Sequence, residues 1–358
     1  MEYKNKYPFV FVGGMLSWGE ENGMYKLPYW GMVCGNLVQQ LRDTGIEAYA
    51  PQVGPMNSAW DRACNLYAML TGTRVDYGVA HSKKNNHARY GRTYAPLVQD
   101  WGKELPDGGI KKVHLLGHSF GGATVLTLVM LMNAGSEEEM AATPENELSP
   151  LFTGGKGDWF YSVTALSAPI NGTSAYEVKD EENKFSDVGM TTTLFNTAST
   201  PPQDGRAHED TADWDMHIDH ALEMVKGFTV VDSVYYFSIP CCMTDIDPDT
   251  GVSVPDTDHM ETIFQVSSRE MGKFTGYTEG GYYVDESWQP NDGLVNTISA
   301  RAPFGQPQQD FDENNVVPGV WNVMPTYRGD HMALQGDLMK TNNVRQLYVD
   351  LINMINHL

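Results

Sequence analysis

The sequence predicts an α/β fold built on a mainly parallel central sheet. Short runs of β-branched and aromatic residues recur along the chain, and amphipathic helical patterns lie between them. Strands that alternate with helices are typical of βαβ units, in which the strands pair in parallel. At 358 residues the chain is long enough for one large domain that carries insertions. We therefore expect a single domain over residues 1–358.

Each predicted element follows from a local pattern. Glycine follows three amphipathic stretches, as is common just past a helix C-terminus, and predicts helices over Cys34–Thr44, Ala59–Leu70 and Gly122–Asn133. The β-branched and aromatic runs predict core strands at Phe9–Val12, Glu47–Pro51, Lys112–Leu116, Tyr161–Leu166, Val234–Ile239 and Trp321–Pro325.

Two stretches fit this alternation poorly and are predicted to be insertions. The first, residues 55–96, holds two histidines and shows little strand signal. The second, residues 171–229, is polar and acidic, with Pro201-Pro202 in its middle and a predicted helix over Met216–Lys226. A long insertion after a core strand is a candidate lid over an active site, and a surface loop without a gating role is the alternative.

Composition excludes several classes of partner. The chain has 24 Lys and Arg against 46 Asp and Glu, and a net charge of −22 repels nucleic acid. No apolar run approaches the roughly 20 residues that span a bilayer. The cysteines, Cys34, Cys64, Cys241 and Cys242, are too few for a dense disulfide framework, so free thiols are expected. Because the N-terminus leads almost directly into a strand, we expect a cytoplasmic protein or a mature chain without its leader.

The pentapeptide Gly117–Gly121, with Ser119 at its centre, has the Gly-x-Ser-x-Gly pattern of a nucleophile elbow. The pattern alone is a weak signal. Here an apolar run, residues 113–116, precedes it directly, and a helical pattern opens at Gly121. This is the strand, sharp turn and helix that the elbow requires, and it predicts an α/β-hydrolase fold with Ser119 as nucleophile.

A serine nucleophile needs a histidine base, which in this fold follows it in the chain. His331 lies in a loop after the last predicted core strand, where the base is expected. The other histidines after Ser119 lie in the second insertion, in a variable loop or at the chain end: His208, His217, His220, His259 and His357. We therefore predict that His331 is the base.

The carboxylate that orients the base has more than one candidate. Asp292 lies in a turn that leads into a short apolar segment. Asp245, Asp247 and Asp249 follow the strand that ends near Ile239, which is another place where a hydrolase can carry its acid. Their spacing also suggests a calcium loop, but Pro248 and the lack of glycine at the sixth position favour a solvated acidic turn.

The oxyanion of a tetrahedral intermediate needs two backbone N–H donors. One is expected from Phe120, directly after the nucleophile. The other is expected from the loop after the first core strand, Gly13-Gly14-Met15, where glycines permit close approach. We predict that Met15 supplies it.

The first insertion also contains residues suited to a metal. Asp61, His81 and His87 offer up to three nitrogen and oxygen ligands for zinc, and the Cys64 thiol lies three residues after Asp61. His81 and His87 are six residues apart, outside the helical spacing of four. Their spacing alone therefore does not define a site.

Several segments together resemble the thermostable Geobacillus and staphylococcal lipases of bacterial lipase family I.5. The resemblance covers nearly the whole chain, and the block from Asp61 to Tyr94 is the most specific. The segments that carry it are Val53–Pro55, Ser58–Cys64, Val75–Gly78, His81, His87–Tyr94, Ser149–Phe152, Asn291–Thr297 and Gly319–Asn322. Those lipases are secreted α/β-hydrolases with a structural zinc in an extra subdomain, so the resemblance implies the same here.

Matched by motif, the resemblance implies Ser119 as nucleophile, Asp292 as acid and His331 as base. It also implies Asp61, His81 and His87 as zinc ligands in a subdomain over 55–96. The fourth ligand falls on Asp210, whereas Asp215 is the alternative. A metal shared by both insertions would fix the base of the lid on the core.

This chain departs from the family pattern at three places. Gly13 stands where the family has a histidine before the oxyanion glycine, so the polar support of that loop is expected to differ. Ala333 occupies the place of a calcium-binding acid, so calcium is not predicted. The lid segment between Pro169 and Asp210 is shorter, which should weaken interfacial activation and open the site to short or bulky esters.

The expected function is hydrolysis of neutral, water-insoluble carboxylic esters such as acylglycerols, through an acyl-enzyme and with transient contact to a lipid interface. A shortened lid also suggests an open groove for aliphatic or aromatic polyesters. Acyl transfer to an acceptor other than water would use the same residues. A catalytically inactive binding protein on a hydrolase scaffold is the alternative from another functional class.

Overall fold

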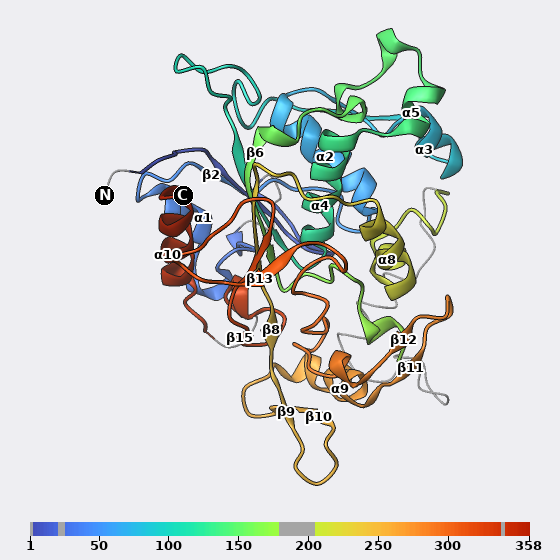
Figure 1. Cartoon of the computed structure of the whole chain (residues 1–358), viewed down its shortest axis with the longest axis vertical. Helices are drawn as coiled ribbons and strands as arrows, with labels where there is room; N and C mark the ends of the chain where they lie inside the picture. The colour runs from blue at the N-terminus through green and yellow to red at the C-terminus, as the bar shows by residue number, and fades with distance from the viewer. Residues whose placement is uncertain (1–2, 21–25, 179–204, 338–340) are drawn as a thin grey trace.

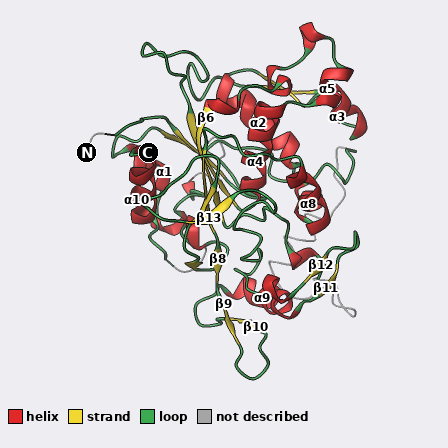
Figure 2. Ribbon diagram, viewed as in Figure 1, coloured by secondary structure: helices red, strands yellow, loops and turns green. Residues whose placement is uncertain are grey.

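A seven-stranded sheet runs through the centre of the computed structural model, which describes residues 3–20, 26–178, 205–337 and 341–358 (Figure 1). The strand order is β13-β14-β7-β6-β5-β1-β2, and every pairing between these strands is parallel. Helices cover both faces of the sheet, as Figure 2 shows. The predicted α/β-hydrolase fold with a mainly parallel sheet is therefore confirmed.

All six predicted core strands are present. A seventh was missed, because Gln308–Asp310 is short and polar and pairs only at the sheet edge, with Trp321–Val323. The strands of the central sheet are β1 (Phe9–Val12), β2 (Ala48–Tyr49), β5 (Val113–His118), β6 (Phe160–Leu166), β7 (Tyr235–Ile239), β13 (Gln308–Asp310) and β14 (Trp321–Val323).

The predicted helices form, with shifted ends. The helix expected from Cys34 begins at Leu37, because Gly35 has a φ of 97° and the Asn36 side chain caps the helix by accepting a hydrogen bond from Gln39 N–H. The helices are α1 (Leu37–Arg42), α2 (Ala59–Thr71), α3 (Val79–Lys84), α4 (Phe120–Ala134), α5 (Glu137–Ala142), α7 (Ala212–Met216), α8 (Ile218–Lys226), α9 (Thr262–Lys273) and α10 (Arg345–Asn356).

The alternation of strand residues divides the core into two layers. On β1, Val10 and Val12 belong to the buried cluster that includes residues of α2, α4 and α8. Phe9 and Phe11 belong to the cluster on the other face, with residues of α1 and α10. Figure 1 shows α1 and α10 on one side of the sheet and α2, α4 and α8 on the other. Each strand side chain therefore packs against one helical layer.

Pairs of short strands lie outside the central sheet. In the first insertion, β3 (Arg74–Asp76) and β4 (Tyr90–Thr93) form an antiparallel pair, so the expectation of little strand there was wrong. Beyond β7 the chain forms β8 (Cys241–Cys242) with β15 (Tyr327–Arg328), β9 (Thr244–Ile246) with β10 (Ser253–Pro255), and β11 (Gly276–Tyr277) with β12 (Tyr283–Val284).

All four cysteines are free thiols, as expected. Pro201-Pro202, at the centre of the second insertion, lies outside the described residues. Among the helices that are described, none combines the length and the apolar character needed to cross a bilayer.

His114, one of the two buried histidines of β5, predicts how stability depends on pH. His114 lies between Ser162 Oγ (2.8 Å from Nδ1) and Asn5 Oδ1 (2.9 Å from Nε2), and burial lowers its pKa to about 3. Below its unfolded pKa of about 6.5, only the unfolded chain takes up this proton. The free energy of unfolding therefore decreases as the pH is lowered. The stability advantage of the wild type over His114→Asn should therefore shrink by about 2 kcal/mol between pH 7 and pH 5. Urea unfolding of both proteins measures this, and a constant difference would contradict it.

Candidate functional site

Ser119 lies in a sharp turn between β5 and α4, with a φ of 55° and a ψ of −132°. This conformation is strained for a residue with a side chain, and such strain persists only where close packing enforces it. A Cβ atom on Gly117 would lie 2.3 Å from Gly121 O, and one on Gly121 would lie 2.2 Å from Val12 O. The two glycines therefore allow α4 to approach β5 and β1 closely enough to form the turn.

The structure brings Ser119, His331 and Asp292 into one hydrogen-bonded line. His331 Nε2 is 2.8 Å from Ser119 Oγ, and His331 Nδ1 is 3.0 Å from Asp292 Oδ2. All three side chains are buried. Because a carboxylate only accepts hydrogen bonds, Nδ1 carries the proton in the neutral ring and Nε2 presents its lone pair to the serine hydroxyl.

The Asp292 carboxylate is held at both oxygens. Oδ1 accepts hydrogen bonds from Leu294 N–H (3.0 Å) and Val295 N–H (2.7 Å). Oδ2 accepts one from the Ser167 hydroxyl, besides its contact with His331. Ser167 directly follows β6 and has a φ of 48°. Sequence reasoning missed Ser167, since a serine at a strand end carries no motif.

The competing carboxylates lie elsewhere. Asp245 is on β9 and forms an ion pair with Arg328 at 2.8 Å. Asp247 Oδ1 accepts hydrogen bonds from the N–H groups of Asp249 and Thr250, so this segment is a local acidic turn. The structure therefore places Asp292, and none of these three, beside His331.

The loop Gly13–Met15 lies against the nucleophile. A Cβ atom on Gly14 would be 2.7 Å from Ser119 Cβ. Met15 and Phe120 pack in the same apolar cluster, which also contains Ala123 and Met216. Within the described residues, neither Met15 N–H nor Phe120 N–H donates a hydrogen bond to another protein group. Both predicted donors are therefore free of protein acceptors, which fits the expectation for an oxyanion site.

Three buried polar residues surround this loop and were not predicted. Arg62 donates to Gly13 O at 2.5 Å and to Gly14 O at 3.0 Å. The Tyr29 hydroxyl lies 3.0 Å from Gly14 N and 2.7 Å from His118 Nδ1. Arg62 stands in the motif next to Asp61, and His118 lies inside the nucleophile pentapeptide, but nothing in their spacing connects either residue to the loop.

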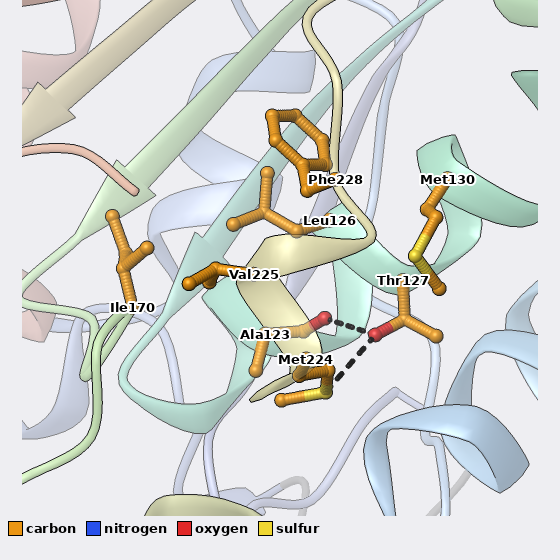
Figure 3. A pocket seen from close by; sticks show the side chains of 8 residues that line it. All are labelled: Ala123, Leu126, Thr127, Met130, Ile170, Met224, Val225 and Phe228. Atoms are coloured by element: carbon orange, nitrogen blue, oxygen red, sulfur yellow. Dashed lines mark hydrogen bonds between the residues drawn. The ribbon is translucent and has the colours of Figure 1, made fainter. Parts of the chain in front are cut away.

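A small apolar cavity lies between α4 and α8 (Figure 3). Its walls are Ala123, Leu126, Thr127, Met130, Ile170, Met224, Val225 and Phe228. The Thr127 hydroxyl is bonded to Ala123 O at 2.8 Å, so it offers no free polar group to a ligand. With a volume of about 20 Å³ the cavity has room for little more than a water molecule, and an acyl chain does not fit it as it stands.

The four expected metal ligands converge in a second place. One ligand atom from each of Asp61, His81, His87 and Asp210 lies within 4.8 Å of the other three. His81 Nε2 is 3.3 Å from Asp61 Oδ1 and 3.2 Å from Asp210 Oδ1, and His87 Nε2 is 3.3 Å from Asp210 Oδ2. The group therefore joins the first insertion to the second.

The chemistry of this group fits a divalent cation. His87 Nδ1 lies 3.0 Å from Ala88 O and must be its protonated nitrogen, because a carbonyl only accepts. His87 Nε2 then turns a lone pair toward two carboxylates. Within the described residues, His87 Nε2 and Asp61 Oδ1 are buried without a hydrogen-bond partner. A cation between these atoms would satisfy both.

The alternative ligands do not join the group. Asp215 Oδ2 accepts a hydrogen bond from Ala59 N–H at 2.7 Å, at the start of α2. Burial raises the pKa of Asp215 to about 7. Cys64 is a buried thiol whose pKa is raised by burial. Of the candidates weighed, Asp210 completes the group, and Asp215 caps a helix.

Comparison with known proteins shows that the chain is similar to proteins named lipases. Residues 5–195 match the model of the family described as "Lipase-like, C-terminal domain". The chain is 34% identical to a lipase of Staphylococcus hyicus over 93% of its own length and 54% of that protein, and so spans about half the length of this curated relative.

Two solved structures are similar over the whole fold. EstA from Clostridium botulinum is 32% identical, with a TM-score of 0.87, over 100% of this chain and 88% of that chain. Lipase 1 from Pelosinus fermentans is 31% identical, with a TM-score of 0.81, over 99% of both chains. The whole chain, insertions included, therefore has structural counterparts.

The close packing at the turn predicts a strongly destabilising substitution. Gly121→Ala would force a methyl group against the Val12 carbonyl oxygen, so the free energy of unfolding should fall by roughly 3 kcal/mol or more. Gly109→Ala is the matched control, since its nearest neighbour is the side chain of Asp107 at 3.3 Å. Urea denaturation compares the two, and equal stabilities would show that the turn tolerates a side chain.

Proposed function

We propose a reaction for this chain, which belongs to the bacterial lipase family. It hydrolyses carboxylic esters, with Ser119 as nucleophile, His331 as base and Asp292 as orienting acid. The single observation that supports this most is the unbroken line of hydrogen bonds from Asp292 through His331 to Ser119. The strained turn at Ser119 further supports the proposal, since such strain is concentrated at functional sites.

The positions of the protons along Asp292, His331 and Ser119 fit the chemistry of an acyl-enzyme. His331 Nε2 takes the proton from Ser119 as the hydroxyl oxygen attacks the ester carbon, and then gives it to the leaving alkoxide. Asp292 stabilises the protonated ring through Nδ1–H. Water repeats the sequence on the acyl-enzyme, with His331 again as base. The Met15 and Phe120 N–H groups would receive the oxyanion in both halves of the reaction.

The surroundings of Ser119 favour a neutral ester with an apolar acyl part. Met15, Phe120, Ala123 and Met216 form an apolar cluster beside the nucleophile. A net charge of −22 disfavours anionic substrates. We propose acylglycerols and related water-insoluble esters as substrates. We also propose polyesters as substrates, because they contain ester bonds of the same kind and the short lid segment of the sequence suggests an open groove.

A structural zinc ion is the second part of the proposal. Two imidazoles and two carboxylates suit zinc, which in structural sites takes four nitrogen, oxygen or sulfur ligands in a tetrahedron. Asp61, His81 and His87 of the first insertion and Asp210 of the second would hold it. When bound, zinc supplies a fixed positive charge that joins the two insertions. The Arg206 guanidinium, 2.8 Å from Asp61 Oδ2, already offsets part of the carboxylate charge.

Removal of the nucleophile tests the proposed reaction. Ser119→Ala should lower kcat for p-nitrophenyl butyrate by more than about 10³-fold, because the acyl-enzyme can no longer form. Ser287→Ala, on an exposed turn, is the matched control. Unchanged turnover in Ser119→Ala would contradict the proposal and favour a catalytically inactive binding protein.

Product analysis with added alcohol distinguishes hydrolysis from acyl transfer. An ester panel from acetate to triglyceride, together with a polyester film, defines the substrate.

Metal removal tests the zinc proposal. Elemental analysis of the purified protein should find about one zinc per chain, and a chelator should lower Tm by more than about 5 °C while ester turnover at low temperature persists. Asp210→Asn should lose the metal, whereas the exposed His259→Asn should keep it. Absence of any metal in the wild-type protein would contradict the proposed zinc site.

A further inference from the structure

We infer that Arg62 and Tyr29 are positioning residues that fix the peptides of the Gly13–Met15 loop, so that the oxyanion site is formed before substrate binds. The inference rests on the proposed function, since it concerns how Met15 N–H is oriented for the reaction at Ser119. It assigns a role to side chains that take no part in the proton transfers described above.

The Arg62 guanidinium, on α2, is fully buried and donates to both carbonyls of this loop, besides a contact of Nη1 with Gly54 O at 3.3 Å. Nη2 donates to Gly13 O at 2.5 Å, and Nη1 donates to Gly14 O at 3.0 Å. Nε donates to Thr124 Oγ1 at 2.8 Å, on the helix that Ser119 begins. One rigid fork therefore connects the loop to the nucleophile helix.

Planarity of the peptide group turns these contacts into an orientation. In a trans peptide the C=O and the following N–H point in opposite directions. Gly14 C=O and Met15 N–H belong to one peptide plane, so an Arg62 contact at the carbonyl directs the Met15 N–H to the opposite side. Within the described residues that N–H has no protein acceptor. Arg62 therefore fixes the direction of the Met15 N–H, which stays available to an acceptor outside the protein.

Tyr29 fixes the preceding peptide from its other end. Gly13 C=O and Gly14 N–H share one plane; Arg62 holds the carbonyl, and the Tyr29 hydroxyl accepts from the N–H at 3.0 Å. With both ends occupied, this plane cannot rotate without losing a buried hydrogen bond. The loop is therefore restrained at both of its peptides.

The same hydroxyl connects the loop to the base. Burial lowers the pKa of His118 to about 3, so its ring is neutral at ordinary pH. His118 Nε2 lies 2.8 Å from His331 O, a carbonyl, and so carries the proton, which leaves Nδ1 to accept from Tyr29 O–H at 2.7 Å. A continuous chain of donors thus runs from Gly14 N–H through Tyr29 and His118 to the backbone of His331.

Fold stability alone does not account for Arg62. Burying a guanidinium is expensive and is usually offset by a carboxylate. Among the described residues, none has a carboxylate oxygen within 4.0 Å of the Arg62 nitrogens, and the group instead lies 5.0 Å from the Phe120 ring centre. An arginine guanidinium is not deprotonated in proteins, so Arg62 carries its positive charge here. A buried positive charge behind the loop has the sign that favours an oxyanion.

Tyr29→Phe is the mildest test, because the ring and its packing are kept. We expect kcat for p-nitrophenyl butyrate to fall about tenfold, with KM changed less than twofold. Tyr236→Phe is the matched control. It also removes a buried hydroxyl, which accepts a hydrogen bond from Val231 N–H at 3.0 Å, but Tyr236 lies on β7 in the core. Both variants should lose Tm, Tyr29→Phe the more because its hydroxyl holds a second hydrogen bond, but only Tyr29→Phe should lose kcat.

Arg62→Lys provides a second, independent variant, since lysine keeps the charge but cannot hold two carbonyls in a fork. An alkyl trifluoromethyl ketone, whose adduct with Ser119 carries the oxyanion, reports on the oxyanion site directly. Its inhibition constant should rise in each variant by the same factor as KM/kcat, and should be unchanged in Tyr236→Phe.

The outcomes separate the inference from the proposed function. If Ser119→Ala keeps its turnover, the proposed function fails. If Ser119→Ala is inactive but Tyr29→Phe and Arg62→Lys match Tyr236→Phe in kcat and inhibitor affinity, the positioning role is wrong and the reaction assignment stands. Loss of kcat with unchanged inhibitor affinity would also overturn the inference, since the oxyanion site would then be intact.

Discussion

The close approach of α4 to β1 and β5 at Gly121 is the constraint on which the site depends. It accompanies the strained turn at Ser119 and sets Gly121, the second residue of α4, against the end of β1. Because the strands are parallel, β1, β5 and β6 end at one edge of the sheet, and their following loops meet there. Ser119, the Gly13–Met15 loop and Ser167 therefore lie together at this edge.

Helix α2 carries two roles on neighbouring residues. Asp61 points to the group that joins the two insertions, and Arg62 points to the loop beside the nucleophile. A change in the position of α2 therefore acts on both. The insertion that holds the metal group is thus more than an appendage, since the helix at its base also supports the peptides around Ser119.

The sequence predicted the fold and the residues proposed for catalysis better than their surroundings. Ser119 and His331 follow from the nucleophile-elbow motif and the chain order that it requires, whereas the four possible metal ligands followed only from the family resemblance. The polar strand β13 was missed because an edge strand needs no apolar pattern. Arg62, Tyr29, His118 and Ser167 could not be found, because their roles come from contacts between segments far apart in the chain. From the residues alone Asp292 was one of four candidate carboxylates; the family resemblance selected it, and the structure places it beside His331.

The loss of a histidine before the oxyanion glycine becomes intelligible from these contacts. Gly13 has no side chain, and a Cβ there would lie 2.5 Å from Ser17 Cβ and 3.0 Å from the Tyr29 ring. The loop is therefore packed too tightly for polar support from its own residues. Support comes instead from Arg62 below and Tyr29 beside it, at the cost of burying a guanidinium without a carboxylate. In the proposed reaction the buried guanidinium would have a second effect besides restraining the loop, because its positive charge has the sign that favours an oxyanion at Ser119.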